Sequence, residues 1–386
     1  MQEPIRTVYL DNSATSFPKA PGVSEAMKLC IDTIGAGVNR SSYRAAQEAG
    51  MTVLETRLLL KELFRFPHKV THVVLTPGAT YSLNFAISGF LKPGDRVLTG
   101  CLEHNAVMRP LNAAPGVTFD RIPGDSEGFL SLDAAEKAIR PDTKLCVLQH
   151  ASNVSGTLQQ LEPFAELMHR KGIPLVVDAA QSAGHVEIDF GALGLAALCA
   201  PGHKGLLGPA GVGVLLLDPA FAKQLTPVIT GGTGSLSESE VQPDLMPDRF
   251  ESGTVNLAGI FGLNAALRWL RSEGIAKLRA HEILLARRFI SGLSSIPGIR
   301  LAGPTDPERR VGVYSVDFPN RDNAEAADLL ETRFGIMTRC GLHCAPNAHK
   351  TLGTWPQGSV RFSTGPFTTE EEIDAALEAI RIVAEC

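Results

Sequence analysis

The chain has 386 residues, of which 44% are hydrophobic and 20% charged, and its formal net charge is −5 at pH 7. This composition is typical of a globular protein with a large core. With no basic block and no apolar run long enough to span a bilayer, it predicts neither nucleic acid nor a membrane as a partner. Seven scattered cysteines, and an N-terminus (Met1 to Thr7) without a signal pattern, predict free thiols in a reducing, cytoplasmic compartment.

The first half of the chain predicts strands that alternate with helices. A short strand at 8–10, helices at 21–34 and 45–64, and a loop at 35–42 come first. Further strands are predicted at 70–75, 96–99, 145–149 and 175–178, and further helices at 79–90 and 161–171. This alternation predicts an α/β fold whose mainly parallel sheet is covered on both faces.

The second half of the chain has a different pattern. Residues 219–249 are rich in Gly, Ser and Pro and predict a loop region. Helices are predicted at 255–272, 276–293, 323–333 and 369–384, strands at 311–318 and 359–363, and a loop at 338–353. These elements predict a second domain of the α+β class.

One lysine, Lys204, lies in a turn rich in Gly and Pro. The turn separates two apolar runs, 195–200 and 212–217, which predict buried strands. Burial lowers the pKa of a lysine and exposes its free amine as a nucleophile. Lys204 is therefore a candidate Schiff-base lysine, and the alternative is a surface lysine on a turn.

Polar side chains also follow the other predicted strands. Residues 76–80, His104, Asn153, Asp178 and Lys204 all lie just past strand ends. Because ligands bind beyond the carboxyl ends of parallel strands, these residues are expected to converge on one crevice. Asp178 would pair there with a protonated pyridine nitrogen, and the alternatives are a helix N-cap or a salt bridge.

Gln181 belongs to the same edge of the predicted sheet as Ala79, Thr80 and His104. Gln181 would contact an oxygen on the same pyridine ring that Asp178 would bind, and the alternative is an amide that caps a turn. Ala79 and Thr80 follow Gly78 at a predicted helix start, which indicates an anion site. It is not a Walker A loop, because the Gly-Lys-Ser/Thr ending of that motif is missing. His104 would stack on an aromatic ring or move protons, and the alternative is a structural histidine.

The C-terminal part adds two candidates. Arg361 lies within an apolar strand and would bind a substrate carboxylate, unless it forms an internal salt bridge. Cys344 lies in a loop with Arg339, His343 and His349, which would hold a thiolate. A zinc site on this loop and a structural thiol are the alternatives.

Taken together, the motifs and their order resemble the cysteine desulfurase family, the class V aminotransferase branch of fold-type I pyridoxal phosphate (PLP) enzymes. The matching segments are Tyr9–Thr15, Gly78–Thr80, Glu103–Asn105, Asn153–Gly156, Val177–Ser182, His203–Lys204, Arg249–Thr254 and Arg361–Ser363. The resemblance implies a large PLP-binding domain at 14–255 with a mainly parallel seven-stranded sheet. It also implies a smaller domain made of 1–13 and 256–386, and a homodimer with shared active sites.

The same resemblance implies PLP as the cofactor and a role for each matching residue. Lys204 would bind the cofactor covalently, Cys344 would carry a persulfide, and His104 would be the third catalytic residue. The cofactor contacts would be Lys204, Ala79, Thr80, His104, Asn153, Asp178, Gln181, His203 and, from the neighbouring subunit, Thr254. Asn153 and Arg361 would bind the substrate carboxylate, and no metal is implied.

Three positions depart from the family's pattern. Pro201 stands where many members have a phosphate-binding serine, a contact that Gly231–Ser235 could replace. Tyr43 stands where the family often has a histidine that faces the partner subunit. Cys340 precedes Gly341 where a small residue is commoner.

The expected activity is that of a PLP-dependent cysteine desulfurase, which converts L-cysteine to L-alanine and leaves a persulfide on Cys344. Selenocysteine is an expected variant substrate, and a sulfur-acceptor protein is an expected partner. One alternative is a PLP-dependent aminotransferase, β-lyase or epimerase that acts on another amino acid, with Cys344 as a bystander. The other is a non-catalytic binding or sulfur-relay protein on the same fold.

Overall fold

A seven-stranded sheet forms the centre of the larger part of the molecule in the computed structural model, which describes residues 7–38 and 43–385. In spatial order its strands are β2 (Val73–Thr76), β8 (Gly213–Leu217), β7 (Ala197–Pro201), β6 (Leu175–Asp178), β5 (Thr143–Gln149), β3 (Arg96–Gly100) and β4 (Thr118–Ile122). Strand β8 runs antiparallel to both of its neighbours, and the other pairs are parallel. The predicted α/β fold with a mainly parallel seven-stranded sheet is confirmed.

Helices cover both faces of this sheet because its strands are apolar on both sides. Successive residues of a strand point to opposite faces, so Val176 and Val177 of β6 lie in two different apolar cores. The core of one face includes α2 (Arg44–Leu63), α6 (Leu161–Lys171) and α8 (Leu257–Glu273). The core of the other face includes α3 (Ala79–Ser88), α4 (Asn105–Ala113) and α7 (Pro219–Gln224). Each fully buried Val or Leu contributes about 1.5–3 kcal/mol to folding.

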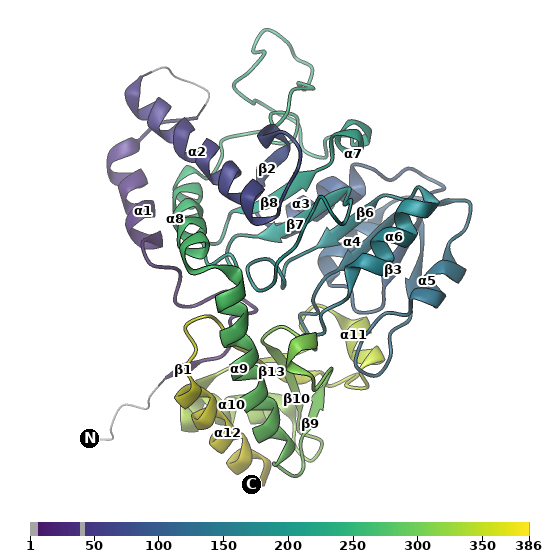
Figure 1. Cartoon of the computed structure of the whole chain (residues 1–386), viewed down its shortest axis with the longest axis vertical. Helices are drawn as coiled ribbons and strands as arrows, with labels where there is room; N and C mark the ends of the chain where they lie inside the picture. Colours follow the sequence, from purple (N-terminus) through teal and green to yellow (C-terminus); the bar gives the residue numbers. More distant parts are fainter. Residues whose placement is uncertain (1–6, 39–42, 386) are drawn as a thin grey trace.

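A second, antiparallel sheet forms the smaller part of the molecule (Figure 1). Its strands, in spatial order, are β12 (Arg339–Gly341), β13 (Ser359–Ser363), β10 (Val313–Asp317) and β9 (Arg300–Ala302). Helices α9 (Ile275–Ser294), α10 (Asn323–Phe334) and α12 (Glu370–Glu385) share its core. The N-terminal β1 (Val8–Tyr9) joins this part by pairing with β11 (Ile336–Met337). The predicted α+β character is confirmed.

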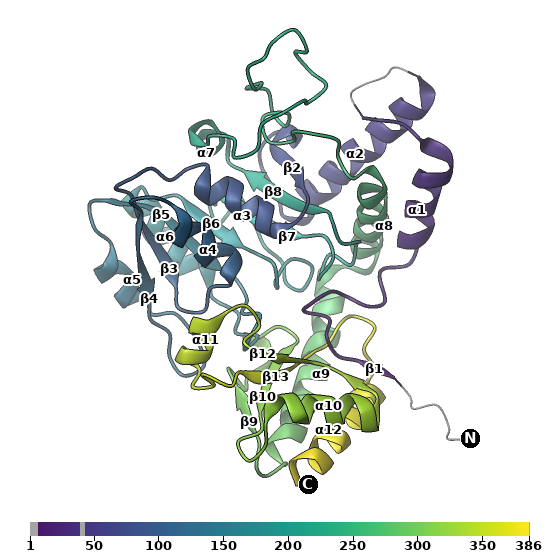
Figure 2. The same ribbon diagram turned by 180° about the vertical axis from the view of Figure 1, so that it is seen from behind.

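The remaining elements are short. They are α1 (Val23–Leu29) with a π-helical turn at Cys30–Ile34, a 3-10 turn at Val70–His72, α5 (Leu132–Ala138), a 3-10 turn at Pro307–Arg309, and α11 (Pro346–Thr351). In Figures 1 and 2, α11 lies between the two sheets, and the loop between α7 and α8 projects from the larger part.

Several short elements were not expected from the sequence. Periodicity predicted no α4, β4 or α5, and α7 lies in a region predicted as loop. The predicted loop at 338–353 contains β12 and α11. Segments of three to nine residues are too short for an apolar period to be recognised, and α4 contains Pro110 in addition. Residues 1–6 of the N-terminal segment lie outside the described part of the chain. So do residues 39–42 of the predicted loop at 35–42.

The predicted domain boundary falls just before α8. Residues Ile260 and Leu263 of α8 belong to the core of the larger sheet, whereas Leu285 and Phe289 of α9 belong to the core of the smaller sheet. The division into 14–255 and 1–13 with 256–386 stays a prediction.

Candidate active site

Lys204 occupies the turn that links β7 to β8, at the carboxyl edge of the larger sheet. Burial lowers its pKa to about 8, and the nearby charge of Asp178 opposes this shift. Within the described part of the chain, no hydrogen bond or ion pair engages its Nζ. Two glycines allow this edge to pack closely, because a Cβ on Gly213 would lie 2.5 Å from the Cα of Gly78. Lys204 is therefore a partly buried amine of lowered basicity rather than a surface lysine.

Asp178 and Gln181 lie beside it, at the end of β6. Asp178 is buried and accepts a hydrogen bond from the Ala180 N–H at 2.9 Å. Burial raises its pKa, which the Ala180 N–H and the charge of Lys204 counteract. Gln181 donates through Nε2 to the carbonyl oxygen of Ser13 at 3.0 Å. The N-terminal segment thus reaches the cluster that the strand ends form.

His104 is the N-cap of α4. Its Nδ1 accepts a hydrogen bond from the Ala106 N–H at 3.0 Å, which places the ring proton on Nε2. Burial lowers the pKa of His104 to about 4, with a further contribution from the charge of Lys204. The ring is therefore neutral at pH 7. The preceding Glu103 accepts from the N–H groups of Gly100 and Gln149, which joins the ends of β3 and β5.

The predicted anion site combines a helix start with a histidine. Ala79 and Thr80 begin α3, and the first N–H groups of a helix have no partner within it. His203 lies on the Lys204 turn, and its buried Nδ1 has no partner in the described part of the chain. Burial and the charges of Lys204 and Lys19 lower the pKa of His203 to about 4.

Thr254 is exposed and lines a cavity with Thr76 and Pro77, just before the start of α3. The segment Gly231–Ser235 bonds to Gln242, Asp248 and Gly253, and no described contact joins it to His203. Tyr43 is exposed at the N-cap of α2.

The buried Arg361 forms an ion pair with Asp11, which is partly exposed. Arg361 is 1% exposed, its Nη2 donates to Asp11 Oδ1 at 2.8 Å, and its Nη1 donates to the Asn153 carbonyl at 3.2 Å. The internal salt bridge considered for Arg361 therefore exists. The Nε of Arg361 stays buried without a partner in the described residues. Sequence reasoning missed Asp11 as a site residue, although it stands within the opening motif at the end of the first strand.

Replacing Asp11 by alanine should lower the free energy of unfolding by about 3 kcal/mol, because the buried guanidinium of Arg361 loses its counter-charge. Urea denaturation measures this change. Asp32→Ala is the matched control, since Asp32 and its partner Lys28 are both exposed and such a pair contributes at most about 1 kcal/mol. Equal losses in the two variants would contradict the prediction.

Among the described residues, three hydrogen bonds hold His343 and Cys344 in place, and Cys344 itself is exposed. His343 and Cys344 have φ values of 49° and 57°, in the left-handed region. The carbonyl of His343 accepts from Asn153 Nδ2 at 2.7 Å, and that of Cys344 accepts from the Asn105 N–H at 2.8 Å. The third contact joins His343 Nε2 to Ser359 Oγ at 3.3 Å. The loop is thereby attached to the residues that follow β3 and β5.

The two histidines of this loop do not hold a thiolate as the sequence suggested. Burial lowers the pKa of His343 to about 2 and that of His349 to about 4, so both rings are neutral at pH 7. His349 bonds instead to Thr354 Oγ1 at 2.7 Å. Among the residues that the structure describes, no group of three or more His, Cys, Asp or Glu side chains is arranged to hold a metal ion. Burial raises the pKa of the second thiol, Cys340.

The buried histidines predict a loss of stability in acid. Burial lowers the pKa of six histidines of the described residues below the usual 6.5: His72, His104, His150, His203, His343 and His349. Between pH 6.5 and about 4 the unfolded chain therefore binds more protons, and each histidine withdraws up to about 1.4 kcal/mol per pH unit from stability. Glu103 and Asp178, with raised pKa values, oppose this trend but are fewer.

Urea unfolding at pH 7 and pH 5 should accordingly give a lower free energy at pH 5. His150→Gln, outside the predicted site, should reduce that difference. An unchanged or higher value at pH 5 would contradict the prediction.

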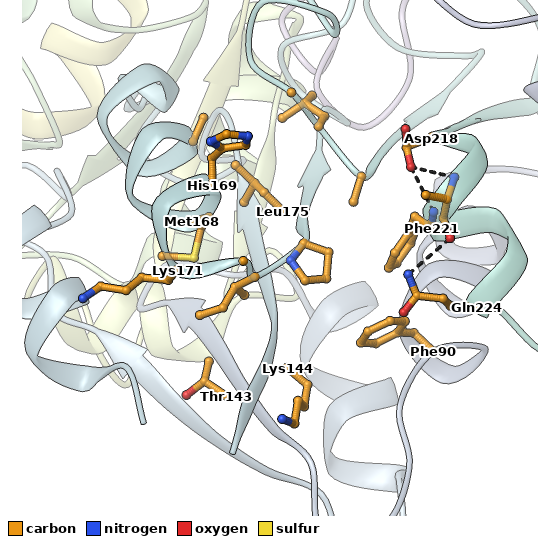
Figure 3. A pocket seen from close by; sticks show the side chains of 18 of the residues that line it. Phe90, Thr143, Lys144, Met168, His169, Lys171, Leu175, Asp218, Phe221 and Gln224 are labelled. Carbon is orange, nitrogen blue, oxygen red and sulfur yellow. Dashed lines mark hydrogen bonds between the residues drawn. The ribbon is translucent and has the colours of Figure 1, made fainter. Parts of the chain in front are cut away.

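A cavity of about 810 Å³ lies at the opposite, amino edge of the same sheet (Figure 3). Its wall includes Thr143, Lys144 and Leu175 at the starts of β5 and β6, together with His169 and Asp218. None of the predicted site residues lines it. The chemistry-bearing residues are therefore gathered at the carboxyl edge, as parallel sheets require.

Comparison with known proteins bears on this arrangement. The family model described as Aminotransferase class-V matches residues 8–376. A probable cysteine desulfurase from Pyrococcus abyssi is 33% identical over 382 residues, which cover 96% of this chain and 92% of that protein. The chain belongs to the cysteine desulfurase branch of the class-V aminotransferases. Enzymes of this family depend on PLP, so the chain is a PLP-dependent enzyme.

Further members of the family are similar over nearly the whole chain. Cysteine desulfurase CsdA of Escherichia coli is 29% identical, with 97% of this chain and 93% of that protein covered. The apo structure of the cysteine desulfurase from Thermococcus onnurineus NA1 matches with a TM-score of 0.90 and 31% identity, over 98% and 95% of the two chains. The fold is that of the fold-type I PLP enzymes. Across the described residues, no helix has the length and apolar character needed to cross a bilayer.

Proposed function

We propose that the protein is a PLP-dependent cysteine desulfurase, which converts L-cysteine to L-alanine and retains the sulfur as a persulfide on Cys344. The observation that carries this proposal is the joining of two reactive groups at one edge of the sheet. The loop of Cys344 is bonded to Asn105 and Asn153, which follow β3 and β5 at the same edge of the sheet at which Lys204 follows β7.

The residues at this edge fit a cofactor with an aldehyde, a ring nitrogen and a phosphate. Lys204 offers an amine without a partner in the described chain, and Asp178 offers a buried carboxylate for a protonated ring nitrogen. The start of α3 and the unpartnered Nδ1 of His203 offer donors to a phosphate. These groups would hold PLP, with Gln181 and the stacked ring of His104. We assign Ala79 and Thr80 as ligands of the phosphate. The serine that many family members have in place of Pro201 is not required for any step.

Bound PLP supplies an electron sink that makes the Cα proton of an amino acid acidic. The amine of Lys204 accepts that proton and later returns one, which its pKa of about 8 favours near neutral pH. Arg361 and Asn153 hold the substrate carboxylate. The buried Nε of Arg361 has no partner in the described residues and so offers a free donor even while Nη2 is bonded to Asp11.

The sulfur step takes place between the substrate and Cys344, with bound PLP as the electron sink. The Cys344 thiolate attacks the sulfur of L-cysteine, a sulfur–sulfur bond forms, and the Cβ–S bond breaks. The electron pair of that bond passes to the carbon skeleton, which takes up a proton at Cβ and leaves as alanine. Selenocysteine is a variant substrate, because its carbon–selenium bond breaks more easily. The exposed position of Cys344 suits transfer of the persulfide to an acceptor protein.

We further propose a homodimer with shared sites, located in the cytoplasm. Support for the dimer is that Thr254 is exposed and that, within the described part of one subunit, no hydrogen bond joins it to Lys204 or His203, as expected of a residue that serves the partner's phosphate site. Support for the compartment is that the cysteines of the described residues are free thiols.

The test is the identity of the products. Purified protein with PLP is given L-cysteine, L-selenocysteine, L-cystine and L-alanine in turn, with and without a thiol reductant. The proposal expects alanine from cysteine, with sulfide released in equal amount once the reductant is present. Formation of a keto acid, or pyruvate and ammonia from cysteine, would assign an aminotransferase or a β-lyase instead.

A further inference from the structure

Lys19 lies where the N-terminal segment crosses the Lys204 turn. Its Nζ donates to Thr15 Oγ1 at 3.0 Å, to Ser16 Oγ at 3.1 Å and to the carbonyl oxygen of His203 at 3.0 Å. An ammonium group has three N–H donors. Each of them thus has an oxygen of the protein, and none is left for a cofactor or a substrate.

The charge of Lys19 is not neutralised locally. Its three acceptors are uncharged, and in the described part of the chain no carboxylate lies within ion-pair distance of its Nζ. Burial lowers the pKa of Lys19 to about 8. A partly buried cation without a counter-charge opposes folding, so the contacts of Lys19 call for an explanation other than stability.

The carbonyl that Lys19 binds is the one before Lys204. It also accepts from the Ser16 N–H at 2.9 Å and from the hydroxyls of Thr15 and Ser16, both at 3.2 Å. Because the peptide group is planar, holding the oxygen of His203 also holds the nitrogen of Lys204. The direction in which the Lys204 side chain leaves the turn depends on that peptide plane.

Residues 11–19, the N-terminal strap, make two more contacts with the site. The Asp11 carboxylate bonds to Arg361, and the Ser13 carbonyl accepts from Gln181. The strap therefore reaches the substrate side, the ring side and the lysine turn, and Lys19 is its fastening to the turn.

We propose that Lys19 is a positioning residue that orients the His203–Lys204 peptide and thereby the reactive amine of Lys204. The inference rests on the proposed function, since it takes Lys204 as the lysine that binds PLP. Lys19 acts through the backbone, which distinguishes it from residues that touch the cofactor.

Its test compares variants of the holoenzyme. Lys19→Met removes the donors and the charge at similar length, and Lys19→Arg retains both. Lys277→Met is the matched control, because Lys277 is exposed and pairs with Glu273 at the end of the preceding helix, α8. The readouts are the pH midpoint of the visible absorption change of PLP bound to Lys204, together with kcat and KM for alanine formation.

For Lys19→Met we expect the midpoint to move by at least about half a pH unit and kcat to fall roughly tenfold, with KM within about twofold. A displaced amine has a different environment, which shifts its pKa, and a poorer geometry for proton transfer, which lowers kcat. Lys19→Arg should keep the pH midpoint and kcat close to their wild-type values, and Lys277→Met should match the wild type in both quantities. Ser16→Ala removes one of the hydroxyl donors to the His203 carbonyl and should shift the midpoint in the same direction by a smaller amount. This variant replaces Lys19→Met in the test if Lys19→Met does not fold.

Two outcomes would overturn the inference. The first is a pH midpoint that is the same in the wild type, Lys19→Met and Ser16→Ala, with only the melting temperature of the variants lowered. Lys19 would then have a structural role only. A wild-type protein that binds PLP nowhere would overturn the proposed function, and this inference with it.

Discussion

Lys204→Ala should lower kcat for alanine formation from L-cysteine by at least about 1,000-fold. The substitution removes both the amine that binds PLP covalently and the base for the Cα proton, and general acid–base catalysis alone contributes roughly 10²–10⁴-fold. Alanine is measured under steady-state conditions with PLP in excess. The visible absorption of lysine-bound PLP should be lost together with the activity.

Folding should not suffer in this variant. Burial disfavours the charged form of Lys204, so its removal should leave the melting temperature of the apoprotein unchanged or raise it. Lys144→Ala is the matched control, since Lys144 is an exposed lysine at the amino edge of the same sheet, beside the cavity of Figure 3. It should retain full activity. More than a tenth of wild-type activity in Lys204→Ala would refute the assignment of this lysine.

Cys344→Ser should lower alanine formation from L-cysteine by at least about 100-fold, because a hydroxyl is a far weaker nucleophile toward sulfur than a thiolate. Exchange of the Cα proton of the substrate with solvent should continue, since Lys204 is unchanged. The two measurements, alanine by chromatography and proton exchange by NMR in deuterated water, separate the sulfur step from the preceding proton transfer.

Cys340→Ser is the control for this variant. Cys340 lies on the same segment, but it is partly buried and its pKa is raised by burial, so it should be close to wild type in both measurements. If Cys340→Ser lost activity while Cys344→Ser retained it, the persulfide would have to be assigned to Cys340 instead of Cys344. Full sulfide release without Cys344 would indicate β-lyase chemistry.

Much of the candidate site could be predicted from local sequence. Asp178 closes an apolar strand, and Lys204 stands alone among glycines between two such strands. A strand that ends on a polar residue positions that residue at the carboxyl edge wherever the strand lies in a parallel sheet. Short elements such as α4 and α11 could not be predicted, because a few residues hold too little periodicity.

The chain by itself therefore determined the α/β class, the edge at which the reactive residues lie, and the candidacy of Lys204 and Cys344. Tertiary structure alone decided how these residues are held. Asp11 meets Arg361 from 350 positions away, and Lys19 meets His203 from 184 positions away. Likewise the neutral state of His343 depends on its burial between remote segments. Hydrogen bonds and desolvation arise from packing between distant parts of the chain, and no local pattern encodes which parts will meet.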